Sequence, residues 1–278
     1  MYWDLLGILF IVCAVLCAVG FYKFVYFLSI GYGFAVAGGG IAVLILNVLI
    51  PRIGSATITP WFIPLIQAAL FVIYGIRLSG FLLVRELKNI TFKKTDVAKE
   101  TLAKNGEKKM PIFVLVAIWI SVAVLYTMQV SPMLFRCFNG STDIVVPIIG
   151  FVISAFGLIL EAIADEQKSA QKKVRPDMVA TKGLYKMCRC PNYLGEIIFW
   201  TGVFVSGITT YGTNIGQWIV AVLAYVCIVY IMFNGAQRLE KRQMERYGDD
   251  EEYNTYANKT PIIIPLLPIY HLNKVEKK

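Results

Sequence analysis

The chain has 278 residues, of which 57% are hydrophobic and only 16% are charged, and its mean hydropathy is +0.63. This composition excludes an ordinary soluble domain and indicates a multi-pass membrane protein whose main surroundings are a lipid bilayer. The formal net charge of +9 does not imply a nucleic-acid partner, because the basic residues gather between apolar runs in the pattern typical of membrane proteins.

Seven apolar runs are long enough to cross a bilayer, since about 20 helical residues span its hydrocarbon core. Lys and Arg gather after the third, fifth and seventh runs, and such an excess marks the cytoplasmic side. We therefore predict an all-α integral membrane protein of about seven transmembrane helices, with the N-terminus outside and the C-terminus cytoplasmic. The runs lie near 4–22, 25–50, 60–84, 111–130, 142–163, 192–210 and 215–235.

We expect one polytopic membrane domain rather than separate folded parts. Within it, residues 1–59 would form N-terminal helices, 60–267 a core that holds cofactor and substrate, and 268–278 a tail.

A first polar face lies on the third run, FVIYGIRLSGFLLVRE (71–86). Tyr74, Arg77 and Arg85 share one helical stripe. With a rise of about 1.5 Å per residue, Arg77 would lie roughly 12 Å deeper than Arg85, too deep for simple snorkelling. We expect Arg77 to face the bundle interior with a ligand or a partner; a purely structural Arg–carboxylate pair is the alternative.

A second polar face closes the fifth run, EAIADEQKSAQKK (161–173). Asp165, Lys168 and Lys172 recur there at helical spacing. Pairs of this kind can be ordinary surface pairs. The alternative is that Asp165, close to the membrane boundary, accepts hydrogen bonds from the hydroxyl groups of a ligand.

A third polar face opens the sixth run, RCPNYLGEIIFW (189–200), where Asn192, Glu196 and Trp200 fall at i, i+4 and i+8. Free backbone N–H groups at this helix start, beside Arg189, would form an anion site. The alternative is that Glu196 pairs with Arg189 and seals the helix end.

The three faces meet at one predicted cytoplasmic edge, which suits a soluble charged cofactor that meets an apolar substrate. A metal is not expected there. The only histidine is His271, and the pair Cys188 and Cys190 has no second cysteine pair beside it.

Four motifs, in order, resemble those of integral-membrane reductases of the steroid 5-alpha-reductase family, its bacterial relatives of unknown function and, more distantly, the sterol reductases. The central motif is GLYKMCRCPNYLGEIIFWTG (183–202), preceded by YGIRLSGFLLVRE (74–86) and EAIADEQK (161–168). The closing pattern of the family is matched by Glu240, Tyr253, Tyr256, Thr260 and Pro265.

The resemblance implies a membrane-embedded oxidoreductase that binds NADPH in a cytoplasm-facing cavity. It would pass hydride to a conjugated C=C bond of a lipophilic, steroid- or enoyl-lipid-like substrate. Tyr74, with Arg77 beside it, would polarise the carbonyl of the substrate. The cofactor-binding residues implied are Arg77, Arg85, Asp165, Lys168, Lys172, Arg189, Asn192, Tyr193, Glu196, Trp200, Glu240, Tyr253 and Tyr256.

Two positions depart from the family pattern. Cys190 replaces the usual histidine, and the second run (31–50) lacks the Gln-Glu pair of the steroid reductases. Isoprenylcysteine carboxyl methyltransferases and phospholipid N-methyltransferases share part of the pattern and bind S-adenosylmethionine. A non-catalytic lipid-binding membrane protein is the third alternative. Glu196 directly after Gly195, and the Tyr74–Arg77 stripe, favour the reductase, placed in a bacterial plasma membrane; substrate and oligomeric state stay open.

Overall fold

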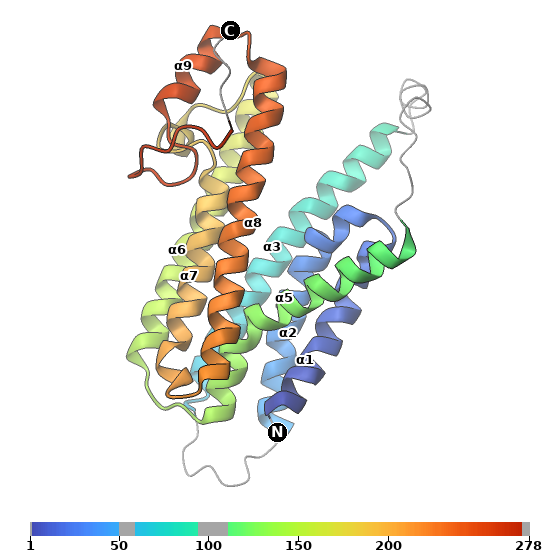
Figure 1. The fold of residues 1–278 in the computed structure, drawn as a ribbon, viewed down its shortest axis with the longest axis vertical. Helices are drawn as coiled ribbons and strands as arrows, with labels where there is room; N and C mark the ends of the chain where they lie inside the picture. The colour runs from blue at the N-terminus through green and yellow to red at the C-terminus, as the bar shows by residue number, and fades with distance from the viewer. Residues whose placement is uncertain (1, 50–58, 94–110, 274–278) are drawn as a thin grey trace. The chain divides into compact units, whose positions relative to one another are not determined.

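The computed structural model describes residues 2–49, 59–93 and 111–273 (Figure 1). Every regular element in these ranges is a helix, which confirms the predicted all-α fold class. The long helices are α1 (Tyr2–Cys17), α2 (Ile30–Leu49), α3 (Phe62–Lys93), α5 (Ile112–Asn139), α6 (Val145–Val174), α7 (Pro191–Tyr211), α8 (Ile215–Tyr247) and α9 (Glu251–Lys259). Three short 3-10 helices are η1 (Ala18–Phe21), η2 (Phe24–Leu28) and η3 (Gly183–Lys186).

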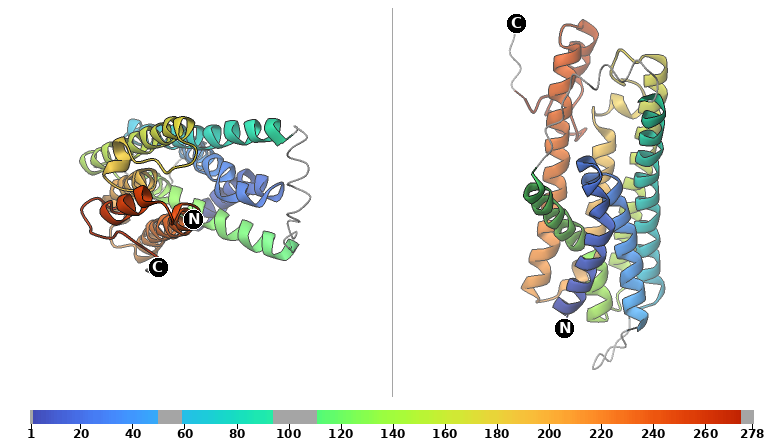
Figure 2. Two further views of the ribbon diagram at one scale, coloured as in Figure 1. Left: turned by 90° about the horizontal axis from the view of Figure 1, so that it is seen from above. Right: turned by 90° about the vertical axis from the view of Figure 1, so that its right-hand side faces the viewer.

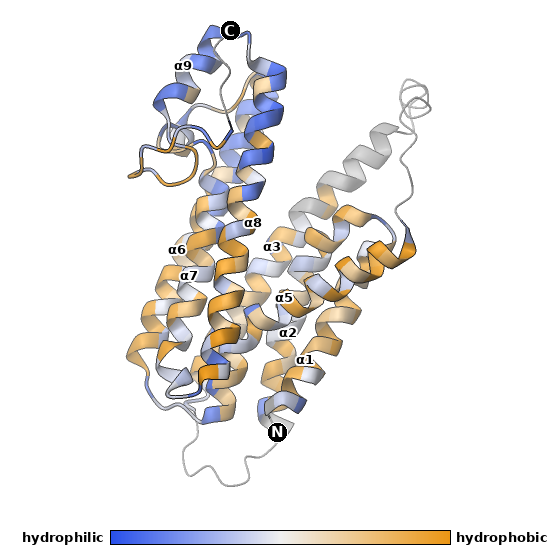
Figure 3. Cartoon of the chain, viewed as in Figure 1, coloured by the Kyte–Doolittle hydropathy of each residue, from blue (hydrophilic) through white to orange (hydrophobic). Residues whose placement is uncertain are grey.

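Six helical stretches of the described chain are long and apolar enough to cross a membrane. In Figure 3 apolar residues dominate most of α8, and hydrophilic residues take over near its C-terminal end and in α9. The predicted sixth span, 192–210, forms the 21-residue helix α7, which does not meet the same criterion. Asn192, Glu196 and several Gly, Ser and Thr residues lower its hydropathy. The multi-pass class is therefore confirmed, whereas the count of seven is not.

The chain divides into two compact units. Unit 1 comprises Met1–Pro147 and Gly207–Ala224, and unit 2 comprises Ile148–Ser206 and Tyr225–Lys278. The predicted single domain, subdivided at residues 59 and 267, stays a prediction; the boundaries between the units follow Pro147, Ser206 and Ala224.

In unit 1, α2 and α3 approach each other closely where glycines face each other (Figure 2). A Cβ atom at Gly33 would lie 2.7 Å from the carbonyl oxygen of Gly75. One turn further along α3, Ser79 Oγ donates to the Ile30 carbonyl at 2.8 Å. Small side chains thus allow backbone contact, and a hydroxyl stabilises it, as is usual between helices in membranes.

In unit 2, α6, α7 and α8 run beside one another (Figures 1 and 2). On its lipid-facing side, α6 carries exposed apolar side chains at helical spacing. On the opposite side its side chains are small or polar. There Ser154 Oγ donates to the Phe199 carbonyl of α7 at 2.9 Å. The exposed stripe consists of Val152, Phe156, Ile159 and Ile163.

The close contact of α6 and α7 predicts a strong effect of enlarging Gly195. A Cβ atom there would lie 2.7 Å from the backbone nitrogen of Glu161, which cannot move aside as a flexible side chain would. Overpacking of this kind costs about 1–3 kcal/mol, so Gly195→Ala should lower the thermal unfolding midpoint in detergent. A Cβ atom at Gly80 of α3 would meet no atom within 4 Å, so Gly80→Ala is the matched control. Equal midpoints for the two variants would contradict this packing.

Candidate cofactor site

A cavity of about 200 Å³ lies within unit 2, among the C-terminal turns of α6 and α8, the helix α9 and the segment 175–190. None of the described residues that line it is acidic, and five are basic: Lys168, Lys172, Arg189, Arg242 and Arg246. Its other lining residues are Val179, Ala180, Leu239, Gln243 and the tyrosines 185, 247 and 256. A concave wall of one charge raises the local concentration of counter-ions, so this cavity favours an anion.

Two glutamines of α6 hold the segment 175–190 in place. Gln167 Oε1 accepts the backbone N–H of Leu184 at 2.8 Å. Gln171 Oε1 accepts the N–H groups of Thr181 and Lys182, both at 2.9 Å. Gln167 and Gln171 lie one turn apart on α6. Each is followed directly by a lysine that lines the cavity, Lys168 or Lys172. One face of α6 thus fixes the loop while the adjacent face supplies charge.

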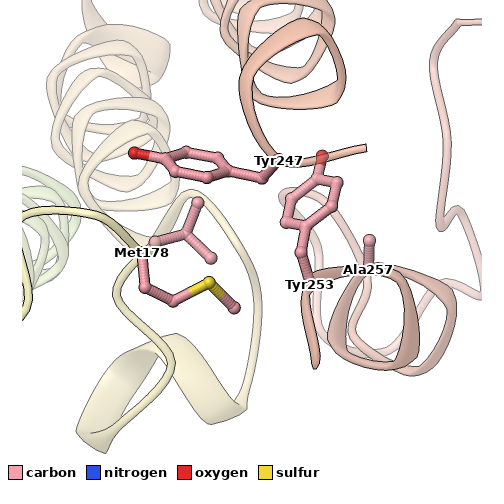
Figure 4. Close-up of a cluster of buried hydrophobic side chains, with 5 residues drawn as sticks. Met178, Tyr247, Tyr253 and Ala257 are labelled. Atoms are coloured by element: carbon pink, nitrogen blue, oxygen red, sulfur yellow. The ribbon is translucent and has the colours of Figure 1, made fainter. Parts of the chain in front are cut away.

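Helix α9 is anchored at its start and along its buried face. Asp250 caps the helix by accepting the N–H of Glu252 at 2.8 Å and that of Tyr253 at 3.2 Å. Figure 4 shows the buried face of α9 packed against the end of α8 and the segment after α6. This cluster consists of Met178, Val179, Tyr247, Tyr253 and Ala257.

Tyr256 closes one side of the cavity. Its hydroxyl donates to the backbone carbonyl of Tyr185 at 2.6 Å. Burial raises the pKa of Tyr256 above its usual range, as it does that of Tyr185. The Tyr256 hydroxyl therefore stays protonated through the physiological range and keeps this hydrogen bond, which ties α9 to the segment before α7.

Arg189 is the buried cation of the cavity wall. It is only 4% exposed, and its Nη2 donates to Glu240 Oε1 at 2.5 Å and to the carbonyl of Tyr270. Its Nε and Nη1, also buried, make no hydrogen bond of normal geometry among the described residues, although the Tyr253 hydroxyl interacts with the guanidinium. Since an unsatisfied buried donor is costly, a ligand atom that accepts from these nitrogens would be stabilised there.

The alternative pairing of Arg189 with Glu196 is wrong. The carboxylate that Arg189 contacts belongs to Glu240, whereas Glu196 Oε1 accepts the indole N–H of Trp200 at 3.0 Å. Glu196 is 5% exposed and lies in α7. Its burial and hydrogen bond make it a positioned acceptor rather than a seal for the helix end.

The backbone N–H groups that directly precede α7 are bonded within the chain. The backbone N–H of Arg189 donates to the Pro261 carbonyl at 2.8 Å, and that of Cys190 donates to the Ile262 carbonyl at 2.9 Å. These two donors are therefore occupied by the chain itself. The anion site predicted at the first-turn N–H groups of α7 stays a prediction, and the basic cavity wall is an anion-attracting feature that the structure describes.

Glu240 holds the C-terminal segment. It is 1% exposed, and its Oε2 accepts the backbone N–H of Leu272 at 2.9 Å and that of Asn273 at 3.0 Å. His271 Nδ1 lies 3.0 Å from its Oε1, the atom that also accepts from Arg189. Glu240 does not belong to the cavity lining, so its geometry favours an anchoring role over the predicted contact with a cofactor.

The structure brings only part of the predicted site together. Four of the predicted residues line the cavity: Lys168, Lys172, Arg189 and Tyr256. Seven others lie in unit 2 outside the lining: Asp165, Asn192, Tyr193, Glu196, Trp200, Glu240 and Tyr253. Arg242 and Arg246 line the cavity but were not among the predicted residues; their only sequence signal is their spacing, one helical turn apart on α8.

The predicted catalytic pair lies in unit 1. Tyr74 is fully buried, and its ring packs edge-to-face against Tyr32, with 5.8 Å between the ring centroids. Arg77 follows one turn later on α3 and is half-buried. The side chain of Arg85 lies outside the described residues.

The two cysteines beside the cavity wall are predicted to be unreactive. Burial raises the pKa of Cys188 to about 11 and that of Cys190 to about 12, so both stay protonated at neutral pH. Because the thiolate is the nucleophile, maleimide should modify neither residue in the folded protein at pH 7, and the rate should rise about tenfold per pH unit. Peptide mass spectrometry measures this. Labelling at pH 7 as fast as in the denatured protein would contradict the burial.

A model of the family described as "Protein of unknown function (DUF1295)" matches residues 36–260. No curated protein and no solved structure matches the chain. The matched stretch contains every residue that lines the basic cavity, from Lys168 to Tyr256.

Proposed function

We propose that this chain, which belongs to the DUF1295 family, is a membrane-embedded reductase that uses NADPH to reduce a conjugated C=C bond of a lipophilic substrate. The observation that carries the proposal is the basic cavity of unit 2, whose most buried cation, Arg189, has two nitrogens that make no hydrogen bond of normal geometry among the described residues. The resemblance of the four sequence motifs supplies the reaction class.

The donor set of the cavity fits the phosphates of NADPH. Five basic side chains match a ligand that carries a diphosphate and a 2′-phosphate, and Arg189 Nε and Nη1 can donate charge-assisted hydrogen bonds to phosphate oxygens. The volume of about 200 Å³ is below the roughly 300–1,000 Å³ of pockets that enclose a whole drug-sized ligand. We therefore assign the phosphate-bearing part of the dinucleotide to this cavity.

The remaining roles are those that the resemblance to the reductase family implies. NADPH, when bound, would supply the hydride; with one proton from water it adds across the C=C bond and leaves NADP⁺ and a saturated product. Glu196, a buried carboxylate, would accept the amide N–H of the nicotinamide, with Asn192 beside it on the same helix face. Tyr74 would donate its hydroxyl proton in a hydrogen bond to the substrate carbonyl, which draws electrons away from the C=C bond.

The charge of the cavity argues against the methyltransferase alternative. S-adenosylmethionine carries a sulfonium and an ammonium group against one carboxylate, so its net charge is positive. A wall with five cations and no acidic residue among its described members would repel it.

A thermal-shift titration of the detergent-purified protein with NADPH, NADH and S-adenosylmethionine tests the proposal. A ligand that binds only the folded state stabilises it by about 2.7 kcal/mol at 100 times its dissociation constant. We expect NADPH to stabilise most, NADH less because it lacks the 2′-phosphate, and S-adenosylmethionine not at all. In Glu196→Ala the NADPH effect should be lost, and the midpoint without ligand should also fall, because the buried indole N–H of Trp200 loses its acceptor.

Stabilisation by S-adenosylmethionine alone would replace the reductase with a methyltransferase. Stabilisation by none of the three ligands would favour a non-catalytic lipid-binding protein.

A further inference from the structure

The segment PIIIPLLPIY (261–270) forms an ordered apolar loop after α9. The N–H of Ile262 donates to the carbonyl of Ile269 at 2.9 Å and closes the loop. Inside it, the N–H of Leu267 donates to the carbonyl of Ile264 at 3.1 Å. The loop contains no ionisable side chain except the phenol of Tyr270. Its shape is therefore fixed by its own backbone hydrogen bonds and three prolines.

The base and the tip of this loop have opposite surroundings. Ile262 and Ile263 are 2% and 1% exposed and pack against α7 and α8. Leu266 is 92% exposed at the tip, followed by Leu267 at 44% and Ile269 at 38%. Single exposed apolar side chains are common on proteins, but an ordered and uncharged tip with three exposed apolar side chains, one of them almost fully exposed, marks an interaction surface.

The base of the loop lies just beyond the lipid-facing part of α8. The exposed apolar face of α8 extends to Tyr230, which is 69% exposed. The loop packs on Phe233 and Ala236, three and six residues further on, which corresponds to about 5–9 Å along the helix. The headgroup layer on each side of a bilayer is roughly 5–8 Å thick, and tyrosines concentrate at its boundary.

The loop also projects sideways from the helices rather than along them. Figure 1 shows it in dark red, extending to one side below α9, and Figure 3 shows its apolar character. A sideways loop at headgroup level presents its tip to lipid. The neighbouring helix α9 has an exposed polar face, formed by Glu251, Glu252, Thr255 and Lys259, and carries no comparable apolar tip.

We propose that the loop tip, Pro265–Ile269, inserts into the headgroup region of the bilayer and forms an interfacial anchor for the C-terminal segment. Insertion removes Leu266, Leu267 and Ile269 from water, while the closed backbone keeps its hydrogen bonds. The anchor is joined to the cavity wall, because the carbonyl of Tyr270 accepts from Arg189. The bilayer thus contacts the segment that positions the buried cation.

Spin labelling in phosphatidylcholine nanodiscs tests this anchor. The native cysteines are buried except Cys227, so Cys227→Ser provides the background. Leu266→Cys places a label at the tip. Thr255→Cys on the exposed face of α9 is the aqueous control, and Val226→Cys on the exposed apolar face of α8 is the lipid control. Collision rates with oxygen, which concentrates in lipid, and with a water-soluble nickel chelate are then compared.

We expect the ratio of oxygen to nickel collisions at position 266 to be severalfold higher than at 255 and lower than at 226. A ratio equal to that at 255 would show a tip in water. Low collision rates with both reagents would show that the tip packs on protein, and dipolar broadening between labels would place a second copy of the chain on it. Each of these three outcomes would overturn the proposal.

Discussion

Arg242→Gln is expected to weaken NADPH binding about tenfold. Arg242 lines the basic cavity from α8 and has an exposed edge. A charge-assisted hydrogen bond at such a half-open site contributes roughly 1–2 kcal/mol, and about 1.4 kcal/mol corresponds to a factor of ten in the dissociation constant. The measurement is a titration of the fluorescence of NADPH with purified protein at low and at moderate salt.

The neighbouring residue gives a matched control. Lys241 has the same charge and is exposed on α8 but does not line the cavity, so Lys241→Gln should change the dissociation constant less than twofold. The loss in Arg242→Gln should shrink as salt is added, because a partly exposed charge is screened. Equal losses in the two variants would mean that the cofactor responds to the general charge of this surface and not to the cavity.

Glu240→Ala is expected to destabilise the C-terminal segment by about 3–5 kcal/mol, because it leaves the buried charge of Arg189 without its carboxylate. The variant also removes the acceptor for the N–H groups of Leu272 and Asn273. Hydrogen exchange should show faster exchange at these two amides and at Arg189 and Cys190, whose partners lie in the same segment.

A surface residue and a double variant separate this effect from a general loss of charge. Glu245 is exposed on the same helix, so Glu245→Ala should change the unfolding midpoint little. In Glu240→Ala combined with Arg189→Met, the unpaired buried charge is gone, so the double variant should be more stable than Glu240→Ala alone. A double variant that is less stable, with additive losses, would contradict a direct Arg189–Glu240 pair.

Local periodicity made much of unit 2 predictable from the sequence. Lys168 and Lys172 are one turn apart on an apolar helix, so their common face follows from helix geometry, and the structure places both on the cavity wall. The apolar runs likewise located the helices α1, α2, α3, α5, α6, α7 and α8, but not the polar helix α9. The apolar run 192–210 predicts helix α7 as a membrane span. The polar residues of α7 nevertheless keep it from meeting the hydropathy criterion that the six other stretches meet.

Long-range pairing could not be predicted in the same way. Arg189 pairs with Glu240, 51 residues later, and not with the nearby Glu196, because the C-terminal part of α8 lies beside the segment that precedes α7. Helical spacing relates only residues that are close in the sequence, so it cannot predict this contact. Arg242 and Arg246 lie in a stretch of alternating charges, where cavity-lining bases look the same as solvated ones. Only the packing of α9 and the segment 175–190 distinguishes them.

A cryo-electron-microscopy structure of the protein with NADPH in nanodiscs tests the central claim most directly. The account predicts density for the phosphates in the cavity of unit 2, within hydrogen-bond distance of Arg189 and at least one of Lys172, Arg242 and Arg246. Dinucleotide density elsewhere in the protein, with the five basic side chains contacting only water, would contradict it.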